Sequence, residues 1–141
     1  IGCDHGGFEL KEKIKVYLQE LKEDIVDVGA YEIDSEDYFS DYVIKMVKAF
    51  SLNPDAKIIA ICGSGVGMSI GLNKNKGIFC AVGHSEEEVK IAREHNNINA
   101  LSMGGRVVNE TLAKKMIDAF LNTNHLGGKH LERMMAIEIK K

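Results

Sequence analysis

The chain has 141 residues, of which 45% are hydrophobic and 28% charged, so it is long enough for one domain with its own core and too apolar to be disordered. Its formal charge of −3 argues against a nucleic-acid-binding module, which normally carries a basic excess. No apolar run approaches the roughly 20 residues that span a bilayer, and we find no signal-peptide pattern. We therefore expect neither a nucleic acid nor a membrane as a partner.

The three cysteines, Cys3, Cys62 and Cys80, are odd in number and lack the spacing of a metal site. This usage predicts a reducing compartment with no disulfide framework. Cys3 and Cys80 lie within strand-like sequence, where we expect them to be inert core residues. Only three of the 18 Lys and Arg residues are arginines, and the sequence assigns no role to Arg93.

Short apolar runs alternate along the chain with amphipathic stretches, and no repeat or linker interrupts this alternation. The runs predict about five strands, over residues 1–3, 25–28, 57–62, 78–82 and 99–103. Apolar residues at helical spacing predict helices around residues 10–21, 43–50, 68–73, 85–92, 109–121 and 128–140. Strands that alternate with helices predict an α/β fold with a parallel sheet and right-handed crossovers.

The polar and glycine-rich residues cluster directly after the predicted strands. These segments are residues 4–7, 29–38, 63–67, 84–85 and 104–106. Because ligands of open parallel sheets bind at the carboxyl ends of the strands, near the point where strand order reverses, we expect a small-molecule site there.

The segment CGSGVG, from Cys62 to Gly67, joins an apolar strand to a helix through closely spaced glycines. Such a turn directs several backbone N–H groups at an anion. Met68 stands where the dinucleotide fingerprint needs glycine and a phosphatase loop needs arginine, and no Gly-Lys-Ser/Thr of a Walker loop is present. The backbone donors favour the thiolate of Cys62, although a strand-terminal cysteine is also commonly a plain core residue.

Two histidines and two cations are further candidates. His5 follows the first predicted strand and His95 ends a predicted helix, and each is either catalytic or structural. Lys129 and Arg133 are spaced i, i+4, so they share one helix face that is either a phosphate clamp or a solvated surface.

Five segments taken together are characteristic. They are residues 2–7 (GCDHGG), 62–67 (CGSGVG), 92–97 (AREHNN), 104–107 (GGRV) and 127–130 (GGKH). In this order and spacing they resemble the ribose-5-phosphate isomerase type B family, to which the galactose-6-phosphate and allose-6-phosphate isomerases are related. The likeness extends over essentially the whole chain.

The resemblance implies a cytoplasmic isomerase of the pentose phosphate pathway that interconverts ribose 5-phosphate and ribulose 5-phosphate without metal or organic cofactor. It implies a Rossmann-like three-layer sandwich with a five-stranded parallel sheet, formed by a single domain over residues 1–141. It also implies a homodimer, or a tetramer, with sites shared between subunits. The helix around residues 128–140 would then pack on the partner subunit.

The resemblance also assigns residue roles. Cys62 is the base that moves a proton between C2 and C1, His95 is the acid that opens the furanose ring, and the Ser64 hydroxyl joins the backbone donors around the oxyanion. Lys129 and Arg133 correspond to a phosphate clamp reaching in from the partner. The full set of substrate-binding positions is Asp4, His5, Gly63, Ser64, Gly65, Val66, Gly67, Asn96, Arg106, Lys129 and Arg133.

The chain departs from the family pattern at a few positions. Ser64 replaces the more usual threonine, Lys129 stands where arginine is common, and Phe39-Ser40 follows Asp37-Tyr38 where proline is common. Lysine trades a bidentate fork for a point charge. Two alternatives therefore stay open, an isomerase of a hexose 6-phosphate such as allose 6-phosphate, and a non-catalytic regulatory domain that binds a sugar phosphate.

Overall fold

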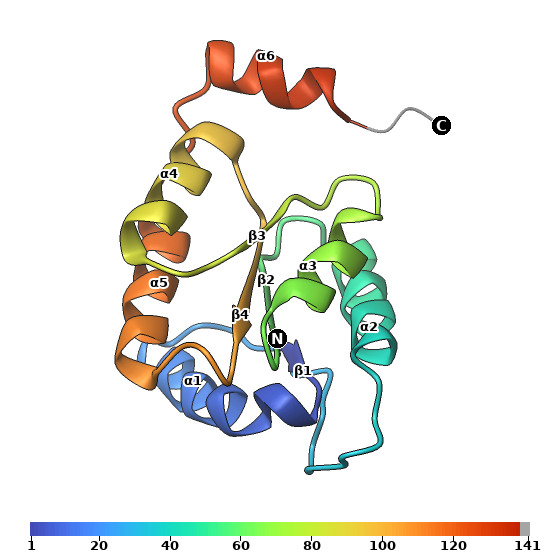
Figure 1. Cartoon of the computed structure of the whole chain (residues 1–141). Helices are drawn as coiled ribbons and strands as arrows, with labels where there is room; N and C mark the ends of the chain where they lie inside the picture. Colours follow the sequence, from blue (N-terminus) through green and yellow to red (C-terminus); the bar gives the residue numbers. More distant parts are fainter. Residues whose placement is uncertain (139–141) are drawn as a thin grey trace.

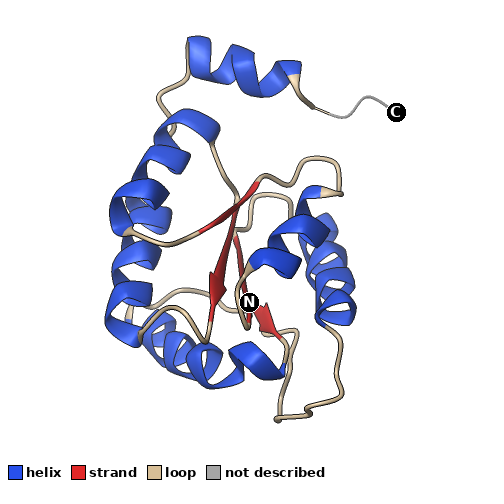
Figure 2. Ribbon diagram, viewed as in Figure 1, coloured by secondary structure: helices blue, strands red, loops and turns tan. Residues whose placement is uncertain are grey.

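A parallel sheet lies between two layers of helices in the computed structural model, which describes residues 1–138 (Figures 1 and 2). Its strands are β1 (Gly2–Cys3), β2 (Ile58–Cys62), β3 (Cys80–Val82) and β4 (Ala100–Gly104). They are ordered β1-β2-β4-β3, and every neighbouring pair is parallel. The α/β class, the parallel sheet and the three-layer sandwich are therefore confirmed.

The helices cover both faces of this sheet. Their bounds are α1 (Phe8–Glu20), α2 (Phe39–Leu52), α3 (Val66–Asn73), α4 (Glu86–Asn96), α5 (Glu110–Asn122) and α6 (Lys129–Ala136), with a 3₁₀ turn η1 (His5–Gly7) before α1. As predicted, Ser85 caps α4 by accepting from the Glu88 N–H at 3.1 Å, and Asn109 caps α5. The last predicted helix, over 128–140, ends earlier at Ala136, and its residues 139 and 140 lie outside the described part of the chain.

Alternate residues of the central strands enter two separate cores. Ile59, Ile61 and Leu101 pack with α1, α4 and α5, whereas Ala60 and Cys62 pack with α2 and α3. Figure 1 shows these two helix layers on opposite sides of the sheet. Cys62 therefore belongs to the α2 and α3 side, at the very end of its strand.

The two remaining cysteines behave differently from each other. Cys3 is fully buried, as the core assignment requires, whereas Cys80 is only partly buried. Burial raises the pKa of each thiol to about 11, so both are protonated at neutral pH.

The prediction of five strands is wrong, because the sheet of the described residues has four. The segment over residues 25–28 does lie beside β1, where Cys3 donates to the carbonyl of Gly29 at 2.7 Å and accepts from the Ala30 N–H at 2.9 Å. In a regular parallel pair these two partners of Cys3 would be separated by one residue. Gly29 has a φ of +99°, outside the extended region, so the ladder loses its regularity there.

Strand order reverses between β1 and β2. From β1 the chain passes through α1 to the segment 25–30 on the outer side of β1, then returns through α2 to β2 on its other side. The carboxyl ends of β1 and β2 are thus the switch point at which an open α/β sheet binds ligands.

A buried ion pair attaches the segment 25–30 to α1. The Lys11 side chain is 0% exposed, and its Nζ lies 2.9 Å from Asp27 Oδ1, while Lys15 Nζ lies 2.9 Å from Asp27 Oδ2. Lys11 also donates to the carbonyl of Ala30. Burial acts to raise the pKa of Asp27, but the hydrogen bonds from Lys15 and Lys11 outweigh it and lower that pKa.

Replacing Lys11 by methionine is expected to lower the free energy of unfolding by about 3 kcal/mol, because it leaves a partly buried carboxylate and a carbonyl short of a donor. The lowered pKa of Asp27 stabilises the fold above pH 3.8, and this contribution is lost as the pH falls through the folded-state value. The variant should therefore also lose less stability on acidification. Urea unfolding at several pH values measures both effects.

Lys15→Met is the matched control, since Lys15 is more exposed and contacts the same carboxylate. It should cost less than about 1 kcal/mol. Equal losses in the two variants would contradict the assignment of Lys11 as the anchor.

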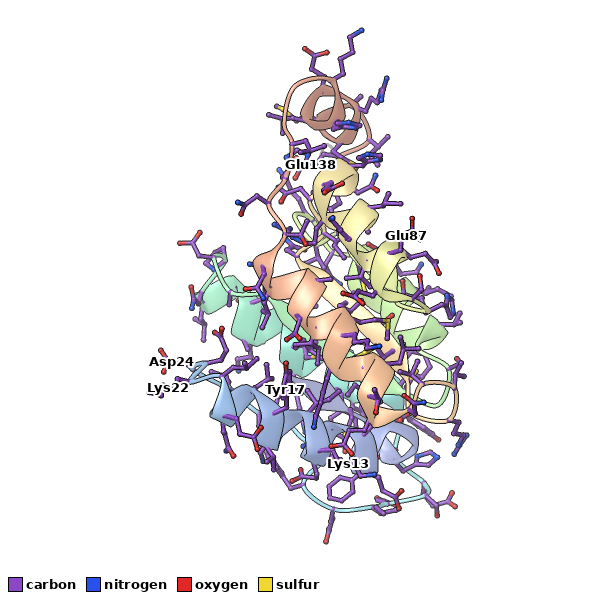
Figure 3. All side chains as sticks on the ribbon, turned by 90° about the vertical axis from the view of Figure 1, so that its left-hand side faces the viewer. Lys13, Tyr17, Lys22, Asp24, Glu87 and Glu138 are labelled. Carbon is purple, nitrogen blue, oxygen red and sulfur yellow. The ribbon has the colours of Figure 1, made fainter. Side chains whose placement is uncertain are left out.

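Helix α6 stands at one end of the molecule, against α4 (Figures 1 and 3). No side chain within Lys129–Ala136 is buried. The connection before it is held by Arg93, which donates to the carbonyls of Thr123 and Ile98 and to the Asn97 side chain. Arg93, which the sequence left unassigned, is therefore a structural residue that ties α4 to the chain leading into α6.

Other contacts join the helices of the same layer. Tyr17 of α1 lies at the junction with α5 (Figure 3), where its hydroxyl donates to Asp118. This hydrogen bond raises the pKa of Tyr17 to about 12. Among residues 1–138 no helix is long and apolar enough to cross a bilayer.

Candidate active site

Three turns meet at the carboxyl ends of β1, β2 and β4. A Cβ built on Gly6 would lie 2.8 Å from the backbone nitrogen of Gly63, and one on Gly104 would lie 2.8 Å from the carbonyl carbon of Ser64. The Gly105 N–H donates to the carbonyl of Cys62 at 2.7 Å. The glycines of the three motifs are therefore required because the turns approach each other backbone to backbone.

The turn after β2 holds the thiol of Cys62 against a backbone donor. Gly65 has a φ of +82°, and its N–H donates to Cys62 Sγ at 3.1 Å. The buried Ser102 hydroxyl of β4 supports the same turn by donating to the carbonyl of Gly65 at 2.9 Å. Because α3 begins at Val66, its unpaired N–H groups and positive dipole end also face this turn.

Cys62 itself is 5% exposed, and the neighbouring Ser64 is exposed. The Ser64 Oγ accepts from the Val66 N–H at 3.3 Å, which leaves its hydroxyl proton for another acceptor. A negative charge that develops on a bound oxygen near this turn would meet backbone and hydroxyl donors together. The turn can thus serve a base and an oxyanion at the same time.

The turn after β1 carries a hydrogen-bonded histidine. His5 Nδ1 lies 2.6 Å from Asp37 Oδ1, and the Asp4 carboxylate accepts from the Gly6 N–H at 2.9 Å. The hydrogen bond to Asp37 raises the pKa of His5, and the charge of Asp4 acts in the same direction. Burial raises the pKa of Asp4, while the Gly6 N–H opposes this change.

Arg106 brings a positive charge to the same place. Its backbone N–H donates to the carbonyl of Gly63 at 3.1 Å. A Cβ on Gly63 would lie 3.0 Å from Arg106 Nη1, so the guanidinium covers that glycine. The sequence predictions for Asp4, His5, the segment 62–67 and Arg106 therefore converge on one corner of the sheet.

Four other predicted site residues lie elsewhere in the same chain. Helix α4 starts after the carboxyl end of β3 and runs back to the amino end of β4, so His95 and Asn96 lie at the opposite end of the strands from Cys62. Lys129 and Arg133 belong to α6, which packs on that end of α4 (Figure 1). The five residues of β4 alone separate these two ends by roughly 13 Å.

These four residues form a group of their own around α6. The His95 and His130 rings stack with centroids 4.2 Å apart and an angle of 8° between their planes. Asn96 Nδ2 lies 3.4 Å from Met134 Sδ. Burial lowers the pKa of His130, and the nearby His95 and Arg133 act the same way, so this ring favours its neutral form.

No metal is assigned to the site. Ligand atoms of Asp4, His5 and Asp37 lie within 4.8 Å of one another. However, the closest two atoms, His5 Nδ1 and Asp37 Oδ1, are joined by a hydrogen bond, which accounts for their proximity. A cavity of about 460 Å³ lies at the amino ends of β1 and β2, and none of the predicted site residues lines it.

Three residues at the site were missed by sequence reasoning: Asp37, Tyr42 and Ser102. Asp37 falls within the segment 29–38, whose place after a predicted strand indicates a ligand site but identifies no single residue. Ser102 sits in the middle of an apolar strand, and a lone serine there is a signal for a buried hydrogen bond. Tyr42 lies within a helix and carries no local signal.

The parallel sheet, with a loop of backbone donors and a thiol at the carboxyl ends of its strands, places the chain among α/β proteins with a small-molecule site at that edge. A family model described as ribose/galactose isomerase matches residues 1–137. The chain belongs to this family, as the five segments indicate.

Curated relatives are similar in sequence to this chain over nearly its full length. Ribose-5-phosphate isomerase B of Escherichia coli is 38% identical over 136 residues, which cover 96% of this chain and 91% of the relative. A putative sugar phosphate isomerase of Bacillus subtilis is 37% identical over 134 residues, 95% of this chain and 90% of the relative.

Solved structures show the same fold. The Thermotoga maritima ribose 5-phosphate isomerase superposes with a TM-score of 0.91 at 39% identity, covering 97% of this chain and 94% of that one. Ribose-5-phosphate isomerase B of Mycoplasma genitalium was solved with bound ribulose 5-phosphate. It superposes with a TM-score of 0.91 at 34% identity, covering 96% of this chain and 90% of that one.

Proposed function

We propose that the protein interconverts ribose 5-phosphate and ribulose 5-phosphate, with Cys62 as the base. The observation that carries this proposal is the thiol of Cys62, held at 3.1 Å by the Gly65 N–H in an anion-binding turn. An enzyme that isomerises an aldose needs a base and fixed oxyanion donors within reach of the same two carbons. Both are supplied here by one six-residue loop. The ribose-5-phosphate isomerase B relatives support the choice of substrate.

Two proton transfers, one between the carbons and one between their oxygens, are sufficient for the isomerisation and need no cofactor. The Cys62 thiolate removes the proton from C2 of the open-chain aldose, and the electron pair moves to the C1 oxygen to give an enediolate. Donors of the turn 63–67 and the Ser64 hydroxyl stabilise this oxygen. The proton on the C2 oxygen passes to the C1 oxygen, and Cys62 returns its proton to C1 to give the ketose.

We propose that the site is completed by a second copy of the chain. His95, assigned to ring opening, lies at the opposite end of the strands from Cys62 within one subunit, as do Asn96, Lys129 and Arg133. Helix α6 also exposes Leu131 and Met135, which a partner subunit would cover. A two-fold dimer brings this end of one subunit to the catalytic corner of the other, and does so twice.

The charge distribution suits a phosphorylated sugar. Arg106 lies at the corner itself, and Lys129 and Arg133 are exposed on α6, spaced i, i+4. Cations that hold the phosphate away from the reacting carbons supply orientation. Near the site, the potential of these cations outweighs the effect of the net charge of −3 on an anionic ligand. The free state of all three cysteines supports a reducing, cytoplasmic location.

The purified protein should convert ribose 5-phosphate, and alkylation of its thiols should abolish the conversion. Substrate present in excess should slow this inactivation, because the reactive thiol lies in the site. Activity is measured by the appearance of the ketose. An unalkylated protein that binds the sugar phosphate but converts none would instead support a regulatory domain.

The hexose alternative is resolved by comparing kcat/KM for ribose 5-phosphate and allose 6-phosphate on the same preparation. We expect the pentose to be preferred, in keeping with the ribose-5-phosphate isomerase B relatives. A higher kcat/KM for allose 6-phosphate would make the hexose phosphate the preferred substrate, while the proposed role of Cys62 would stay the same.

A further inference from the structure

The loop that joins the segment 25–30 to α2 contributes a side chain to the catalytic corner. Its residue Asp37 has a side chain only 8% exposed, although most of the surrounding loop is exposed. Asp37 Oδ1 accepts from the His5 ring at 2.6 Å and from the His5 backbone N–H at 3.2 Å. One carboxylate oxygen thus holds both the backbone and the ring of the same histidine.

The second oxygen of Asp37 is held as well. Tyr42, one turn into α2, donates its hydroxyl to Asp37 Oδ2 at 3.2 Å. Burial and the charge of Asp37 raise the pKa of Tyr42 to about 12, so this hydroxyl keeps its proton throughout the neutral range. Tyr42 and His5 therefore both donate to Asp37, and this chain of hydrogen bonds fixes the carboxylate between α2 and the His5 ring.

This chain determines which nitrogen of His5 meets a ligand. A carboxylate can only accept, so Nδ1 of His5 must carry a hydrogen, and Nε2 is the ring nitrogen left for another group. We infer that Asp37 is a positioning residue for the isomerase reaction, acting through His5 to present Nε2 to the sugar phosphate. The inference rests on the proposed function and extends it to a residue outside the five recognised segments.

The protonation state of His5 responds to its neighbours on three turns. The hydrogen bond that His5 donates to Asp37 raises the pKa of His5, the charge of Asp4 raises it further, and burial and Arg106 oppose them. Asp37 thus extends the pH range in which Nε2 donates a hydrogen bond, the form that suits a phosphate or sugar oxygen.

The test uses Asp37→Asn, which keeps the shape and an acceptor oxygen but removes the charge. In the substrate-free protein the His5 ring, identified by NMR as the resonance missing from His5→Gln, should titrate at lower pH in this variant. We expect kcat/KM for ribose 5-phosphate to fall about 10-fold, the lower end of the loss that follows when a metal-bound histidine loses its orienting carboxylate. The same substitution in a His5→Gln background should cause no further loss.

Asp34→Asn is the matched control, because Asp34 lies in the same loop and its carboxylate accepts from the Glu36 N–H rather than from His5. It should change neither the titration nor kcat/KM. An unmoved His5 titration in Asp37→Asn, or an equal loss of kcat/KM in the His5→Gln background, would overturn the inference. If the wild type fails to isomerise any sugar phosphate yet the titration moves, the pairing stands and the proposed function falls.

Discussion

Cys62→Ala should lower kcat for ribose 5-phosphate by a factor of about 10²–10⁴, the usual contribution of a placed base. Binding should persist, because the backbone donors of residues 63–67 and the side chain of Arg106 are unchanged. Cys62 is 5% exposed at the end of β2, and alanine fits the same extended backbone without a new contact. The loss should therefore appear in kcat rather than in the dissociation constant of a non-isomerisable analogue such as ribitol 5-phosphate.

Cys80→Ala is the matched control for this result. It removes a partly buried thiol from β3, which pairs with β4 and forms the edge of the sheet opposite to β1. Burial raises the pKa of Cys80 to about 11, so its thiol is a poor base at neutral pH and kcat should be unaffected. A Cys62→Ala enzyme with wild-type kcat would remove the thiol from the mechanism.

Local patterns were sufficient to predict most elements of the fold. Apolar periodicity predicts where strands and helices lie, and the capping residues Ser85 and Asn109 act where the sequence places them. The carboxyl-end rule brings together Asp4, Cys62 and Arg106, because every strand of a parallel sheet ends at the same edge. These inferences need no knowledge of long-range packing.

Features set by contacts between distant segments were not predictable in this way. The segment 25–28 has strand composition, yet the positive φ of Gly29 breaks the regular ladder of hydrogen bonds beside β1. Lys11 lies on a helix rich in charge, and its complete burial depends on Asp27, which comes much later in the chain. Asp37 acquires its partner His5 only when its loop folds across the end of β1.

The position of His95 is a further case, and it bears directly on function. The five segments place His95 in the same site as Cys62, whereas a helix that follows a parallel strand carries its last residues back to the amino end of the sheet. Both statements hold together only if the site combines two chains. The fold thus gives an independent physical reason for the shared site that the resemblance implies.

Mixing Cys62→Ala protein with Arg133→Ala protein should restore activity that neither has alone. In a heterodimer, one site combines the intact Cys62 of one chain with the intact Arg133 of the other, while the second site carries both defects. Random exchange into two-fold dimers should therefore recover about one quarter of the wild-type sites. The measurement is kcat/KM for ribose 5-phosphate before and after subunits exchange.

Arg106→Ala provides the matched control, since it removes the same side chain from the corner that already holds Cys62. In a heterodimer of Arg106→Ala with Cys62→Ala each site carries one defect, so no activity should return. Recovery with both arginine variants would mean that Arg106 also acts across the interface. No recovery with Arg133→Ala, in a sample shown by native mass spectrometry to contain heterodimers, would mean that α6 does not serve the partner's site, and His95 would then need another role.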